Sequence, residues 1–268
     1  MNLPVKGKLS LIYRSSFLVA ILMMAASIAG LRYRAVIYPT DELVRTLVPN
    51  DVVNLFIGLP ILLGSMYLAR RGKLIGLLCL PGALFFVLYN YTAYVFAMPL
   101  NWAFPLHLVL MTLSAYALIA LVALIDGKAV QQRLSGAVPE RFAGGILAGL
   151  GLLFLLRMIG VMVGALTRGN LPTEAEFAVN IADFLTTPAW IIVGILLWKR
   201  KELGYVTGLG LLFQGSVLFI ALIIFLLLQP VLTSTPFAIA DVLVIFVMGL
   251  ICFIPFALFV RGVISNRK

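Results

Sequence analysis

Charged residues are scarce in this chain of 268 residues: they make up 11% of it, against 63% hydrophobic residues. A soluble domain has roughly 25% charged and about 45–50% apolar residues. The chain therefore has too little polar material to cover a surface in water. This shortage excludes a soluble enzyme and a nucleic-acid-binding domain, although the net charge of +10 would by itself suit nucleic acid.

Residues and motifs that carry chemistry are also few. His107 is the single histidine, which excludes the membrane desaturases and intramembrane proteases whose metal sites need several histidines. Cys79 and Cys252 each lie inside an apolar run and have no metal-ligand spacing. There is no phosphate-binding loop of the Walker A type and no Gly-x-Ser-x-Gly nucleophile motif. We therefore predict no metal and no cofactor.

Long apolar runs dominate the chain instead. A helix needs about 20 apolar residues to cross the hydrocarbon core of a bilayer. Eight segments have this character, and basic or proline-containing stretches separate them: 15–36, 52–69, 74–98, 104–125, 142–167, 178–198, 203–229 and 237–260. The sequence predicts an all-α integral membrane protein with eight transmembrane helices, embedded in the lipid bilayer.

The basic residues indicate how these helices are oriented. With a cytoplasmic N-terminus, 15 of the 20 Lys and Arg residues fall on the cytoplasmic side, and Arg32, Arg34, Arg45 and Arg168 fall on the other. Positive residues in short loops favour the cytoplasmic side. We expect a multi-pass protein of the plasma (cytoplasmic) membrane with both termini in the cytoplasm.

The first helix allows an alternative interpretation. Lys6, Lys8 and Arg14 precede an apolar stretch that ends in Ser27-Ile28-Ala29-Gly30, as in a secretory signal with a small-residue cleavage site. Cleavage after Ala29 would leave seven spans and an external N-terminus. The internal repeat described next needs the first helix and favours its retention.

Five landmarks recur in the same order in both halves of the chain. They are a Phe–Arg pair, a Pro-Thr-acid element, an acid early in the next helix, a basic loop and two prolines six residues apart. The first half has Phe17–Arg32, Pro39-Thr40-Asp41, Asp51, Arg70-Arg71 and Pro99–Pro105; the second has Phe142–Arg157, Pro172-Thr173-Glu174, Asp183, Lys199-Arg200 and Pro230–Pro236. The pattern predicts two parallel four-helix repeats, 1–126 and 142–268, joined by a cytoplasmic linker, 127–141.

Two smaller patterns concern individual helices. Thr40 and Thr173 have the form of helix N-caps, which predicts a short interfacial helix in each outer loop. Small residues spaced four apart in the fifth span, Gly145–Gly149 and Gly160–Gly164, allow close helix contact and predict that this span is central. The fifth span, or the loop after it, is also expected to be about two turns longer than its counterpart.

Polar residues at membrane depth are the candidate functional residues, because an ionisable side chain at the bilayer centre costs about 2.5–3.5 kcal/mol. Arg157 is the deepest, sixteen residues from Arg141 and eleven from Arg168. It is expected to pair with Asp183 or Asp241, and Arg32 with Asp51 in the first half. The other candidates for a substrate-binding site are Asn180, Asn54, Tyr91 and His107.

Nearly all of these residues fall in the outer halves of their helices, which predicts a polar cavity open to the outside. The first function hypothesis is therefore a transporter or channel-like protein for a small polar or anionic solute. The intramembrane charges can also be structural clamps, as in a non-catalytic accessory or assembly subunit with a membrane-protein partner. A third hypothesis is a lipid-modifying enzyme that uses Asp and His as acid and base and Arg157 on a phosphate.

Overall fold

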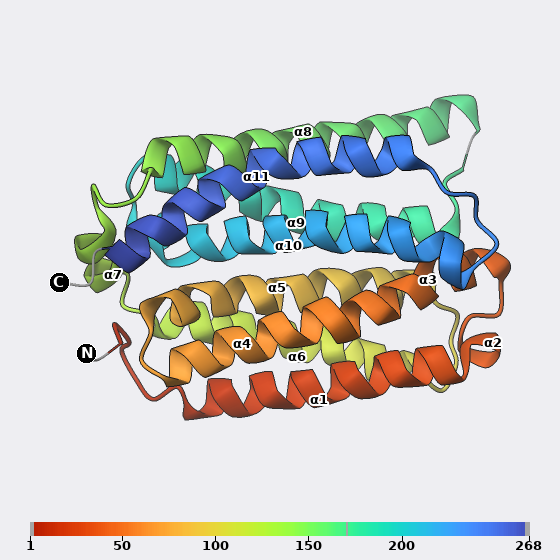
Figure 1. Cartoon of the computed structure of the whole chain (residues 1–268), viewed down its shortest axis with the longest axis horizontal. Coiled ribbons are helices and arrows are strands. Elements are labelled where there is room, and N and C mark those ends of the chain that lie inside the picture. Colours follow the sequence, from red (N-terminus) through yellow and green to blue (C-terminus); the bar gives the residue numbers. More distant parts are fainter. Residues whose placement is uncertain (1–2, 170, 266–268) are drawn as a thin grey trace.

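The computed structural model describes residues 3–169 and 171–265, and these fold almost entirely into helices (Figure 1). In chain order the elements are α1 (Ser10–Arg32), α2 (Arg34–Ile37), α3 (Asp41–Val53), a π-helix η1 (Asn54–Gly58), α4 (Leu59–Arg70), α5 (Leu74–Ala97), α6 (Phe104–Leu124), α7 (Gly127–Leu134), α8 (Glu140–Arg168), α9 (Glu174–Trp198), α10 (Glu202–Leu232) and α11 (Ile239–Ser265).

Eight helices in this described part are long and apolar enough to cross a membrane, as predicted, with α3, η1 and α4 forming one continuous helix of 30 residues. The length and composition of these helices suit a helical, multi-pass membrane protein. The start of α1, the end of α11 and the short helix α7 lie at one end of the bundle, hereafter the α7 end (Figure 1).

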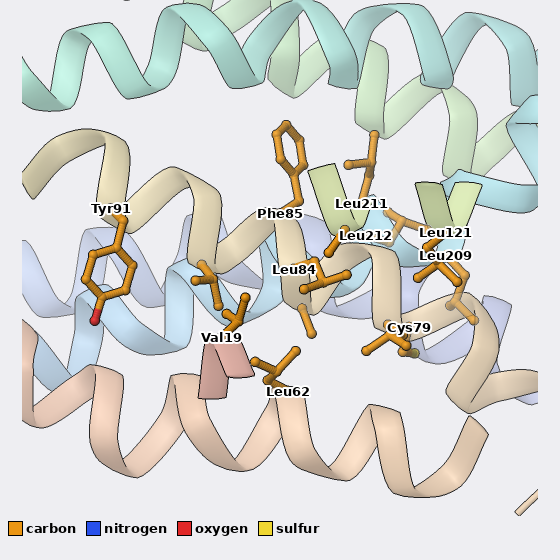
Figure 2. Packing of buried hydrophobic residues seen from close by; sticks show 14 of the residues in the cluster. Val19, Leu62, Cys79, Leu84, Phe85, Tyr91, Leu121, Leu209, Leu211 and Leu212 are labelled. Carbon is orange, nitrogen blue, oxygen red and sulfur yellow. The ribbon is translucent and has the colours of Figure 1, made fainter. Parts of the chain in front are cut away.

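The most buried span is α5, of which 78% is buried, and it packs against α4, α6, α9 and α10. Figure 2 shows Leu84 and Phe85 of α5 among side chains from neighbouring helices. The expectation that the fifth span is central is wrong: α8 is only 22% buried. Of the four glycines in the predicted pattern, only Gly145 lies at a helix contact, against Trp198 of α9; Gly149, Gly160 and Gly164 have open space where a side chain would be.

The closest approach of the two halves is between α5 and α10. A Cβ added to Gly82 would overlap the backbone carbonyl of Gly210, and a Cβ added to Gly210 would lie 3.0 Å from the backbone nitrogen of Gly82. Because neither residue has a side chain, the two helix backbones touch directly here. This pair is called the glycine crossing below.

Both predicted N-caps are present. The hydroxyl oxygen of Thr40 accepts from the backbone N–H of Leu43 at 3.3 Å, and Thr173 forms a complete capping box with Glu176. These threonines, however, begin the spanning helices themselves. The only short helix in the described part of the two outer loops is α2, so the expectation of an interfacial helix after each cap is wrong. The expected extra length lies in α8, which has 29 residues against 23 in α1.

The π-helix η1 interrupts the second span directly before Leu59-Pro60. Proline lacks the N–H that would continue the α-helical hydrogen bonds, and a π-turn holds one extra residue. One residue corresponds to about 100° of helix rotation. The bulge therefore turns the face of α3 that carries Asp51 relative to α4.

One carboxylate fastens the α7 end of the second half. Glu140 is 5% exposed, and its Oε1 accepts from the backbone N–H of Gly136 at 2.7 Å and from the Tyr205 hydroxyl at 2.9 Å. We expect Glu140→Ala to lower the free energy of unfolding by about 1–3 kcal/mol, because the buried Tyr205 hydroxyl loses its acceptor. Thermal unfolding of the purified protein in detergent measures this.

The matched control is Arg200→Ala. Arg200 is exposed and its Nη2 lies 3.9 Å from Glu140 Oε2, so this pair contributes about 0–1 kcal/mol. Equal destabilisation by the two substitutions would contradict the assignment of the effect to the buried hydrogen bonds.

Candidate functional site

A cavity of about 1100 Å³ lies between the two halves of the molecule. Its walls come from α3 and α5 on one side and from α8, α9, α10 and α11 on the other. Asp41 and Glu42 at the start of α3, residues 171–173 and Thr235 also line it. Because these residues belong to the end of the bundle opposite the α7 end, the cavity extends to that end.

An ion pair lies on the wall of this cavity. Arg157 Nη1 is 3.5 Å from Asp183 Oδ2, so the pairing expected for Arg157 is confirmed with Asp183 and not with Asp241. The Arg157 side chain is 55% exposed and that of Asp183 15%. The hydroxyl of Tyr89 on α5 donates to Asp183 Oδ1 at 3.0 Å and so links the two halves. Tyr89 was not among the site residues predicted from the sequence.

Further polar groups extend from this pair toward the mouth. Asn180 lies one turn from Asp183 on α9, is 3% exposed and lines the cavity. On the opposite wall, Asn50 donates from Nδ2 to Asn90 Oδ1 at 3.2 Å. At the mouth, Glu42 Oε1 accepts from the backbone N–H of Ala175 at 3.2 Å, which holds the start of α9 against α3. Polar groups thus occur from the middle of the cavity outward, within a wall that is mostly apolar.

Two sequence candidates lie away from this cavity. Asp241 is exposed in the first turn of α11 and is not among the lining residues. Arg32 is exposed at the end of α1, with its guanidinium carbon 5.7 Å from the centre of the Tyr33 ring. The expected Arg32–Asp51 pair is therefore wrong: Asp51 is 1% exposed and uses hydroxyl groups in place of a cation.

Three further first-half candidates, Asp51, Tyr91 and His107, pack with Tyr38 and Tyr94, which were not among the candidates. We call these five residues, each at most 1% exposed, the closed cluster. The hydroxyls of Tyr38 and Tyr94 donate to the two carboxylate oxygens of Asp51 at 2.6 and 2.9 Å. Burial, and then the neighbouring Asp51, raise the pKa of the Tyr38 phenol well above its ordinary value, so this hydroxyl keeps its proton and acts as a donor.

Close packing seals the closed cluster. The His107 ring stacks on Tyr94 with centroids 5.0 Å apart and on Tyr91 at 5.7 Å. Neither His107 nitrogen has a hydrogen-bond partner within the described residues, and the same holds for the amide of Asn54, which is 0% exposed on η1. A Cβ at Gly30 would overlap the Asp51 carboxylate, so α1 approaches this group directly.

The arrangement separates groups that one catalytic mechanism would need together. Arg157 and Asp183 line the cavity, whereas His107 belongs to the closed cluster and is absent from the cavity wall. Over residues 3–169 and 171–265, no three His, Cys, Asp or Glu side chains gather as a metal site would require. The cavity therefore offers charge pairing, hydrogen bonding and apolar contact to a ligand.

No protein-family model, no curated protein and no solved structure matches this chain.

Proposed function

We propose that this protein is a transporter or channel-like protein for a small solute, with a polar cavity that faces outward. The observation that carries the proposal is the ion pair between Arg157 and Asp183 on the wall of a cavity of about 1100 Å³. An ion pair used only to clamp two helices is normally packed on all sides. Here the Arg157 side chain keeps 55% of its surface accessible and is among the residues that line the cavity.

The proposed orientation in the plasma membrane has both termini and α7 in the cytoplasm. The support is the charge pattern: of the 18 Lys and Arg residues within the described residues, 13 belong to segments of the α7 end. Short loops rich in these residues stay on the cytoplasmic side. The cavity reaches the opposite end, which makes it outward-facing in this orientation.

The internal repeat is part of the same proposal, with a first unit of residues 1–126, a linker of 127–141 and a second unit of 142–268. Its main support is a pair of turns 128 residues apart, around Gly72 and Arg200. Both residues have positive φ, 72° and 54°, and Arg200 is the one described non-glycine residue that does. Three successive N–H groups in each turn bond to equivalent carbonyls: 71 to 67, 72 to 69 and 73 to 68, then 199 to 195, 200 to 197 and 201 to 196.

The same offset relates the two residues of the glycine crossing to each other, because Gly82 and Gly210 are also 128 residues apart. Equivalent residues of two units meet only close to the axis that relates the units. The contact pattern fits as well: α1 with α6 corresponds to α8 with α11, and α5 with α6 to α10 with α11. These observations support a two-fold axis along the membrane normal, between Gly82 and Gly210.

The register also revises which polar residues correspond. Pro60 and Pro188 match across the 128-residue offset, and the extra residue of η1 changes the offset to 129 before them. Asp183 then corresponds to Asn54, and Asn180 corresponds to Asp51. The five landmarks of the sequence instead match Asp51 with Asp183, which differs by one helical turn. In the proposed repeat an acid and an amide have exchanged positions.

The two alternatives have less support. A non-catalytic accessory subunit predicts a packed bundle without a pocket, and the cavity argues against it. A lipid-modifying enzyme needs its acid, base and phosphate-binding groups in one site, whereas His107 lies in the closed cluster and not beside Arg157. The transport proposal requires only the cavity and the groups that line it.

The test measures solute flux into proteoliposomes by light scattering after an osmotic step, with glycerol, glycine, phenylalanine, lactate and phosphate as probes. The variant Ala93→Trp fills the cavity from its α5 wall. We expect at least one probe to cross several-fold faster than in protein-free liposomes, and Ala93→Trp to remove that excess.

The control is Ala25→Trp, on the exposed face of α1, which should leave the flux unchanged. Failure of every probe to exceed the protein-free rate would overturn the transport proposal. So would a folded Ala93→Trp protein with undiminished flux, since the solute would then bypass the cavity.

A further inference from the structure

The cavity is layered from its floor to its mouth. Phe154 and Trp190 meet edge to face with ring centroids 6.2 Å apart, and Phe154 lies 6.3 Å from Phe219. All three line the cavity. Because α8 and α10 run away from the α7 end and α9 runs toward it, these rings lie deeper than Arg157 and Asp183. They form an aromatic floor directly beneath the ion pair.

The ion pair leaves hydrogen-bonding capacity unused. A guanidinium has five N–H donors. The described residues give Arg157 no hydrogen bond beyond its contact with Asp183, and that contact is long at 3.5 Å. Thr187, one turn deeper on α9, is 3% exposed and lines the cavity, and its Oγ1 has no hydrogen-bond partner in the described part of the chain. The guanidinium donors of Arg157, which suit an anionic group, thus lie beside the carboxylate of Asp183, which suits a cationic one.

The charge balance decides which ligand fits these groups. A simple anion on Arg157 would compete with Asp183 and leave that carboxylate unpaired at membrane depth, which is costly. A simple cation on Asp183 would be repelled by Arg157. A ligand that has both charges opens the pair and replaces it with two pairs, so that no charge is left alone.

The charge of the mouth agrees with this argument. The lining residues there include three acids, Asp41, Glu42 and Glu176, against one base, Arg45. This excess of negative charge opposes the entry of an anion and not that of a net-neutral solute. It therefore argues against the anionic solute that Arg157 alone would suggest.

We propose that the cavity binds a zwitterion with an apolar side group, of the α-amino-acid type. Its carboxylate pairs with Arg157, its ammonium group pairs with Asp183, and its apolar group packs on the floor of Phe154, Trp190 and Phe219. The inference rests on the proposed transport function and specifies the solute class for the same cavity.

The experiment is a binding titration that uses Trp190 as the reporter. Trp102 and Trp198 are replaced by Phe, which leaves Trp190 as the only tryptophan. The probes are phenylalanine, glycine, phenethylamine and 3-phenylpropanoate, which differ by the side group, the carboxylate or the ammonium group. We expect phenylalanine to change Trp190 fluorescence and to bind at least ten-fold more tightly than the other three.

Two variants distinguish recognition from a structural role. Arg157→Gln should shift the preference toward phenethylamine, because the repelling cation and the carboxylate partner are both removed. Asp183→Asn should shift it toward 3-phenylpropanoate for the converse reason. The control Arg34→Gln changes an exposed arginine on α2 and should leave the order of affinities unchanged. A purely structural ion pair would alter stability without these opposite shifts.

The outcomes separate the two proposals. Phenylalanine binding no tighter than its singly charged analogues, or the absence of a Trp190 response in folded protein, overturns the zwitterion proposal. If another probe still crosses proteoliposome membranes and is blocked by Ala93→Trp, the transport function stands and only the solute class is wrong. A flux that is unchanged by Ala93→Trp would overturn the transport proposal itself.

Discussion

Replacing Gly82 with alanine is expected to destabilise the protein by about 3 kcal/mol, at the upper part of the usual cost of overpacking. The added Cβ would overlap the carbonyl oxygen of Gly210 and lie 2.6 Å from its carbonyl carbon, where ordinary Cβ contacts begin at about 3.4 Å. The obstacle is backbone, so no side chain can rotate away. Because α5 also packs against α4, α6 and α9, the helix cannot retreat. Thermal unfolding in detergent and the yield of monodisperse protein measure the effect.

The matched control is Gly64→Ala in α4, where nothing lies within 4 Å of the new Cβ. Alanine favours a helix over glycine by about 1 kcal/mol, so this variant should be as stable as the parent or more so. The two substitutions are thus expected to change the stability of the protein in opposite directions. A Gly82→Ala protein as stable as Gly64→Ala would contradict the glycine crossing.

Replacing Asp51 with leucine is expected to lower the free energy of unfolding by about 2–3 kcal/mol. The substitution removes the carboxylate that accepts from the buried Tyr38 hydroxyl. Each buried donor left unpaired costs about 1–3 kcal/mol. The Tyr94 hydroxyl is partly protected, because it lies 3.3 Å from the backbone oxygen of Leu47. The melting temperature of purified protein reports the loss.

The double variant Asp51→Leu with Tyr38→Phe is the control, since it removes the orphaned hydroxyl together with its acceptor. It should recover most of the lost stability. A single Asp51→Leu variant that melts at or above the parent temperature would mean that Asp51 is retained at a cost to stability, as functional groups often are.

The sequence predicted what depends on local chemistry. Eight spans follow from apolar length, and the caps at Thr40 and Thr173 follow from the preference of hydroxyl side chains for the first free N–H groups of a helix. The Arg157–Asp183 pair was one of two pairings open to Arg157, because the length of the arginine side chain limits its partners to about one turn outward.

What the sequence could not provide is the rotation of each helix about its own axis. The glycines of α8 are spaced for close contact, yet Gly149, Gly160 and Gly164 face open space. The sequence could not show this, because apolar residues surround the whole helix and give no periodic signal. The same lack of a polar face gave no sign that the hydroxyls of Tyr38 and Tyr94 pair with Asp51, or that the hydroxyl of Tyr89 pairs with Asp183 beside Arg157. A tyrosine near a membrane interface resembles any other until its neighbours are known.

The glycine crossing has a consequence for the history of the chain. If the two units descend from one ancestral four-helix protein, that ancestor met its own copy through the same glycine on both partners, since equivalent residues touch at Gly82 and Gly210. Such a homodimer would have had two identical sites. Fusion of the genes would then have freed each copy to diverge, with a closed cluster around Asp51 in one unit and Asp183 of the other unit on the wall of an open cavity.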